Sequence, residues 1–135
     1  MTSLRMNTRT SGQWGLLLAL AFAASGAFAH HSISGQYDLS RRTTLQGVIS
    51  RVDWINPHAY VYLDVEEPDG GTTTWALATI PLPMMRKAGL TREALAGTPG
   101  ESVTIEVMPG LEGRHQGWII KIAYPDGHFY QLSGR

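Results

Sequence analysis

The sequence predicts a mainly β protein, a small closed barrel of antiparallel strands with one short helix between its third and fourth strands. Three observations support this fold. Residues 58–66 alternate between apolar and polar side chains, which is the period of a strand with one buried face. Turn residues such as Pro68-Asp69-Gly70-Gly71 separate several segments of this kind. The β pattern stops over residues 81–95, where a helix fits.

Alternation, β-branched residues and turn signals place six strands along the chain. They are expected at residues 43–54, 58–66, 72–78, 102–108, 117–123 and 128–132. Gly47 lies inside the first strand, where a glycine indicates a bulge or a sharp bend. The tryptophans of three strands, Trp54, Trp75 and Trp118, are expected to build the core.

The segment between the third and fourth strands carries helix signals. Pro83–Ala88 has a proline near its start and Gly89 as a C-terminal cap, which predicts a short helix. Thr91 precedes a second helical turn as its N-cap. We expect Met84 and Met85 to pack this segment against one end of the barrel, although thioethers also suit Cu(I).

A mostly antiparallel sheet of this size removes its edges by closing. A long first strand that bends at a glycine, with a helix before the fourth strand, matches the Greek-key barrel of the OB type. We therefore assign an OB-like β-barrel domain to residues 43–135, and a polar N-terminal arm to residues 30–42. An open sheet or a different small barrel is the alternative.

The first 29 residues have the three parts of a secretory signal peptide. Arg5 and Arg9 form a positive region, an apolar run covers residues 14–24, and Ala27-Phe28-Ala29 is a small-x-small cleavage pattern. The apolar run is shorter than the roughly 20 residues that cross a membrane. We expect cleavage after Ala29, a periplasmic or secreted protein, and no membrane span after cleavage.

Composition excludes several classes of function. The 135 residues include no cysteine, which rules out disulfides, thiolate metal sites and a cysteine nucleophile. Eleven basic residues balance eleven acidic ones, so we expect no nucleic-acid partner. There is no nucleophile elbow, phosphate loop or His-Glu-x-x-His motif. We therefore expect a binding module rather than an enzyme.

Cleavage after Ala29 would make His30 the first residue of the mature protein, followed by His31. The α-amine and the imidazole of a terminal histidine chelate one cation, and a further imidazole completes a T-shaped nitrogen site that suits Cu(II). Cleavage after Ala27 would place histidine third, an arrangement that also binds Cu(II) or Ni(II). The alternative is a histidine on a mobile terminus without a metal.

The candidate partner in the folded domain is His58, whose backbone Pro57 constrains. We predict that His30, His31 and His58 gather one Cu(II) ion or a similar cation. Tyr60, Tyr62 and Asp64 share a strand face with His58, and this outer face is a possible binding surface. The competing hypothesis is a metal-free interaction domain that binds a protein, a peptide or an envelope glycan there. A small copper oxidase or oxygenase is the third possibility.

The chain resembles an exported bacterial family, the domain of unknown function 6152. The resemblance rests on His30-His31-Ser32, on the segment from Leu45 to Ala59 with its Asn56-Pro57-His58, on Thr74–Leu77, on Gly100–Ile105 and on Pro125–Gly127. It implies a small, secreted, β-rich domain with the same histidines, and it implies no established activity. The segment from Ala78 to Pro83 departs from the family, which has a more acidic or glycine-bearing run there.

Overall fold

The structure is a computed structural model, and it describes residues 33–134. This part of the chain contains six strands and short helical segments. In chain order the elements are η1 (Ile33–Gly35), β1 (Thr43–Asp53), β2 (His58–Glu66), β3 (Thr72–Pro81), α2 (Leu82–Lys87), α3 (Arg92–Ala96), β4 (Ser102–Pro109), η2 (Leu111–Gly113), β5 (Gln116–Ala123) and β6 (Phe129–Gln131). None of the described helices is long and apolar enough to cross a membrane.

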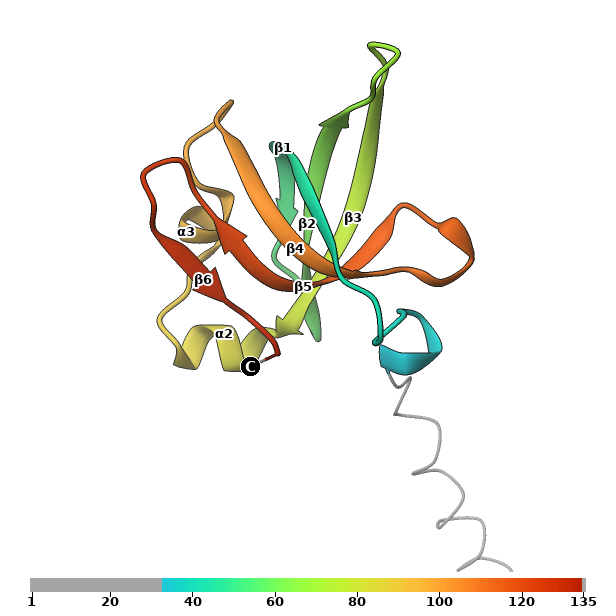
Figure 1. Cartoon of the computed structure of the whole chain (residues 1–135). Coiled ribbons are helices and arrows are strands. Elements are labelled where there is room, and N and C mark those ends of the chain that lie inside the picture. Colours follow the sequence, from blue (N-terminus) through green and yellow to red (C-terminus); the bar gives the residue numbers. More distant parts are fainter. Residues whose placement is uncertain (1–32, 135) are drawn as a thin grey trace, which may run out of the picture. The chain divides into compact units, whose positions relative to one another are not determined.

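The first five strands close into a barrel, which confirms the predicted OB-like fold. The strand order is β3-β2-β1-β4-β5-β6, and β3 also pairs with β5 in parallel. All other neighbours are antiparallel. The two helices lie at one side of the barrel, and the β2–β3 hairpin projects at the top of the view (Figure 1).

The barrel interior is built by the predicted alternation. In β2, Ala59, Val61 and Leu63 are fully buried, while the polar side chains between them are only half-buried. Both helices contribute to the same core, α2 through Leu82 and Met85 and α3 through Leu95. The helical segment therefore packs against the barrel and shares its hydrophobic core, as the sequence predicted.

Gly47 marks a close approach of β1 and β2. A Cβ atom added there would lie 2.2 Å from the carbonyl oxygen of Asp64, closer than any side chain tolerates. The bulge in this strand pair falls a few residues later, between Ile49 and Arg51. Glycine is thus needed for backbone proximity, one of the meanings that a glycine inside a strand can have.

The helical segment and the end of β3 differ in detail from the prediction. Thr91 caps α3 as expected, since its Oγ1 accepts a hydrogen bond from Ala94 N. The segment forms two helices, because Gly89 with its positive φ ends the first. β3 runs three residues further than predicted, to Pro81, because Pro81 pairs with His58 at the sheet edge.

A second buried cluster lies outside the barrel. It consists of Tyr37, Ala78 and Trp118, with Tyr60, Ile80 and Met108 packed around it. Ala78 in β3 pairs with Trp118 in β5. Their neighbours along each strand face the barrel interior, so the side chains of Ala78 and Trp118 point outward. They are buried because the N-terminal arm returns over them. The predicted inward place of Trp118 was therefore wrong, whereas Trp54 and Trp75 pack against the main core.

Candidate functional site

His58 begins β2, and its ring is held by the opposite strand. Nδ1 lies 2.9 Å from the carbonyl oxygen of Thr79 in β3. A carbonyl oxygen only accepts hydrogen bonds, so the proton of the neutral ring sits on Nδ1. The lone pair then lies on Nε2, which has no hydrogen-bond partner among the described residues. Metal-ligating histidines are oriented in this same way by a carbonyl behind the ring.

Trp118 forms a wall beside the His58 ring. The two ring centroids lie 5.3 Å apart in an edge-on arrangement, with an interplanar angle of 70°. Trp118 is itself fixed, because its Nε1 donates to Ser133 Oγ and Ser133 Oγ donates to the Ile119 carbonyl. The half-buried His58 therefore has one defined ring orientation.

Tyr37 covers Trp118 from the arm. Its side chain is only 5% exposed, and its ring centroid lies 6.0 Å from that of Trp118. Burial raises the pKa of the Tyr37 phenol, with a smaller contribution from Tyr60. The backbone around it is anchored, since Asp38 N donates to the Pro109 carbonyl and Tyr37 bridges to Gly110.

The other predicted copper ligands, His30 and His31, lie outside the described residues. The structure thus gives the surroundings of His58 only. Within residues 33–134 there is no group of three or more His, Asp or Glu side chains that could hold a metal ion.

The predicted binding face on β2 is engaged by intramolecular contacts. Tyr60 packs against the cluster around Trp118. The guanidinium of Arg51 lies 3.9 Å from the centre of the Tyr62 ring, and Asp64 accepts a hydrogen bond from Thr74 at 2.6 Å. The outward direction of these three side chains agrees with the alternation, while their role as a binding surface stays a prediction.

Two further histidines, His115 and His128, are exposed and lie in the connections before β5 and before β6. His115 contacts the Trp75 ring at a centroid distance of 5.3 Å. His128 stacks on Tyr124 at 4.3 Å, and its Nδ1 bonds Asp126. Hydrogen bonds from the backbone and the ring of His128 lower the pKa of the Asp126 carboxyl. Both methionines were expected to pack on the barrel: Met85 is buried in the core, whereas the expectation is wrong for Met84, which is 57% exposed.

Sequence reasoning missed two residues around His58. Thr79 supplies the carbonyl that selects the His58 tautomer, and it lies 21 residues away along the chain. Tyr37 is an aromatic residue in a polar arm, and this isolated apolar signal was available in the sequence. It would have indicated that the arm packs on the barrel.

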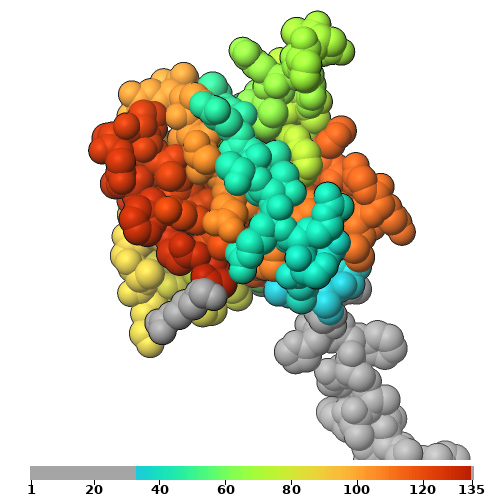
Figure 2. Space-filling model, in the orientation of Figure 1, coloured from blue at the N-terminus to red at the C-terminus, as the bar shows by residue number. Residues whose placement is uncertain are grey.

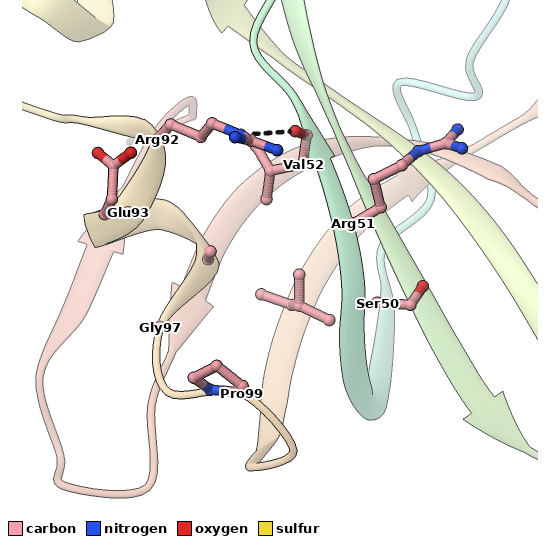
Figure 3. Close-up of a pocket in the computed structure, with 9 residues that line it drawn as sticks. Ser50, Arg51, Val52, Arg92, Glu93, Gly97 and Pro99 are labelled. Carbon is pink, nitrogen blue, oxygen red and sulfur yellow. Dashed lines mark hydrogen bonds between the residues drawn. The ribbon is translucent and has the colours of Figure 1, made fainter.

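Besides these contacts, the described residues line several surface hollows. One of 270 Å³ lies between β1 and α3, where Arg92 Nε donates to the Val52 carbonyl and Arg51 points away (Figure 3). Another, of 580 Å³, lies beside the close approach at Gly47 and contains Asp64 and Glu66. A further hollow lies between the arm and the β4–β5 loop.

Comparisons with known proteins identify a family and no function. No curated protein and no solved structure matches the chain. The model of a family of unknown function, DUF6152, matches residues 18–119, which is more than half of the 135 residues. The chain therefore belongs to the DUF6152 family.

Proposed function

We propose that the mature protein is an exported binding module that holds one Cu(II) ion through His30, His31 and His58. The observation that carries the proposal is the environment of His58. A carbonyl oxygen fixes the proton on Nδ1, and Nε2 keeps a lone pair for a metal. A neutral imidazole nitrogen in a fixed direction is a ligand that Cu(II) prefers.

The remaining ligands come from the mature N-terminus in this proposal. After cleavage behind Ala29, the α-amine and the ring of His30 would bind the ion together. An α-amine has a pKa of about 7.7–8.0, so it loses its proton to a metal at modest cost near neutral pH. His31 would add a second imidazole next to it.

Chain length supports the proposal. Tyr37 and His58 both contact Trp118, with ring centroids 6.0 and 5.3 Å from its own. His31 precedes Tyr37 by six residues, and because Ile33–Gly35 form η1, this stretch spans less than the about 20 Å of a fully extended chain. A connection of this length is compatible with an imidazole from the N-terminus at His58 Nε2.

The test begins with the intact mass of exported protein that carries no N-terminal tag, followed by a Cu(II) titration against a competing chelator. We expect a chain that starts at His30 and binds one Cu(II). The affinity should fall at least about tenfold in H58A, and also when one glycine precedes His30 and displaces the amine. H115A removes an exposed histidine and is the matched control. Because Trp118 lies beside His58, copper should quench its fluorescence, and the W118F variant identifies that signal.

Two results would overturn the proposal. One is a protein with the correct N-terminus that binds copper no more tightly than a peptide of its first nine residues. The other is an H58A variant whose copper affinity is unchanged. Cleavage after Ala27 would give this same result, because histidine would then be the third residue and His58 would not be a ligand. In the absence of copper binding, the metal-free interaction domain is the hypothesis that remains. Turnover with a reductant would instead indicate a copper oxidase.

A further inference from the structure

We propose that the hollow between the N-terminal arm, β3 and the β4–β5 loop binds one neutral sugar ring of a glycan. The hollow has a volume of 280 Å³. This is just below the roughly 300–1,000 Å³ that sites for drug-sized molecules occupy, which suits a single ring. The arm lies directly beside the loop of residues 110–115, drawn in orange at the right (Figure 2). The inference is independent of copper.

Trp75 supplies the apolar surface of the hollow. It is half-buried and packs against the main core. Its ring centroid lies 5.3 Å from that of His115, with an interplanar angle of 53°. Its position is therefore fixed before any ligand arrives. Its indole N–H has no hydrogen-bond partner in the part of the chain that the structure describes. A fixed indole with a free donor offers both apolar contact and a polar bond to one ligand.

Charged side chains of both signs line the same hollow as the indole. Arg114 Nη2 lies 3.3 Å from Glu112 Oε2, and Arg114 Nε donates to the Leu111 carbonyl. Asp38 Oδ1 accepts two hydrogen bonds from Ser40. The side chains of this ion pair are exposed, Arg114 to 50% and Glu112 to 81%, and Glu112 Oε1 and Arg114 Nη1 are unbonded within residues 33–134. The rim of the hollow thus offers both hydrogen-bond donors and acceptors.

This rim selects the class of ligand. The lining includes Asp38, Arg41, Glu112 and Arg114, so its formal charges cancel. A carboxylate or phosphate ligand would meet two carboxylates at the rim. Sugar hydroxyls both donate and accept, so each finds a partner on either kind of side chain. A neutral polyol ring therefore fits this combination better than an anion or a cation does.

The loop that forms the rim holds an unfavourable backbone conformation. Glu112 has φ 62° and ψ 26°, the left-handed region that non-glycine residues seldom adopt. Backbone strain of this kind concentrates at binding sites, where the surrounding structure enforces it. The position agrees in part: OB barrels bind oligonucleotides and oligosaccharides on their second and third strands and on the loops after strands one and four, and of these β3 and the β4–β5 loop line the hollow.

The experiment is a titration followed by two-dimensional amide NMR, in EDTA so that no metal contributes. The probes are chitotetraose and maltotetraose as neutral glycans, tetragalacturonate as an acidic one, and glycylglycine as a zwitterion. We expect a neutral glycan to bind with a Kd of about 1 mM or tighter and to shift the Trp75 indole signal and amides 110–115.

Variants locate the site and separate it from loss of folding. W75F keeps an apolar ring on the core and should weaken binding about threefold to tenfold. E112Q changes one exposed acceptor and should weaken it as well, with an unchanged Tm. R92A alters the hollow beside α3 and is the control. Shifts confined to other surfaces, binding only of the acidic or zwitterionic probe, or no binding of either neutral glycan would each overturn the inference.

Discussion

Replacement of Tyr37 by alanine should release the N-terminal arm and leave the barrel folded. The Tyr37 side chain is 5% exposed and lies against Trp118 outside the barrel core. Two backbone hydrogen bonds accompany it, from Asp38 N to the Pro109 carbonyl at 2.9 Å and from Leu111 N to the Gln36 carbonyl at 3.0 Å. The main core contains none of these residues, so it keeps its packing in the variant.

The size of the effect follows from the buried ring. Burial of a large aromatic side chain contributes about 2–3 kcal/mol, and this is the contribution that Y37A removes from the docked arm. Because 1.4 kcal/mol corresponds to a factor of ten, the arm should open about 30 to 150 times more often. The amides of Asp38 and Leu111 should lose hydrogen-exchange protection by that factor.

Native-state hydrogen exchange measures this directly. Y37F is the matched control, because the phenol oxygen of Tyr37 has no hydrogen-bond partner among the described residues. Its protection should equal that of the wild type. The reasoning fails if Y37A leaves the amides of Asp38 and Leu111 as protected as before. It also fails if the amide of Val61 in the barrel loses protection to the same extent, since the arm would then belong to one unit with the barrel.

Three other predictions concern the barrel. G47A should lower the free energy of unfolding by about 3 kcal/mol in urea melts, because its Cβ would meet the Asp64 carbonyl at 2.2 Å. T79V should cost about 1–2 kcal/mol, since the buried hydroxyl is lost, and copper affinity should not change because the Thr79 carbonyl remains. Burial raises the pKa of Tyr124 above its usual 10.0. Its contribution to stability is therefore complete below pH 10 and is lost as the pH rises further, a dependence that Y124F should remove in alkaline melts.

Local signals predicted the strands and caps because each depends on neighbouring residues. The alternation over residues 58–66 gave both faces of β2, and Thr91 gave the start of α3. The place of Trp118 needed a contact between the arm and β5, which no local pattern contains. An outward tryptophan becomes buried only when a distant segment returns to cover it.

The candidate site shows the same division. Pro57 suggested a fixed direction for His58, but the tautomer depends on a carbonyl oxygen from another strand. The hollow beside Trp75 joins the arm, β3 and the β4–β5 loop, three segments that are far apart in the sequence. Its residues were therefore predicted separately as arm, core and turn, and only the fold brings them together.

The pairing of β1 has a consequence for how the chain folds. Thr43 pairs with Val107 in β4, and the parallel contact of β3 with β5 closes the ring only after nearly the whole domain is present. Most stabilising contacts thus join residues of high sequence separation, the topology that slows folding to the millisecond-to-second range. A chain that ends before β5 would expose unpaired strand edges to neighbouring molecules. The barrel should consequently form in one all-or-none transition, without a stable half-closed state.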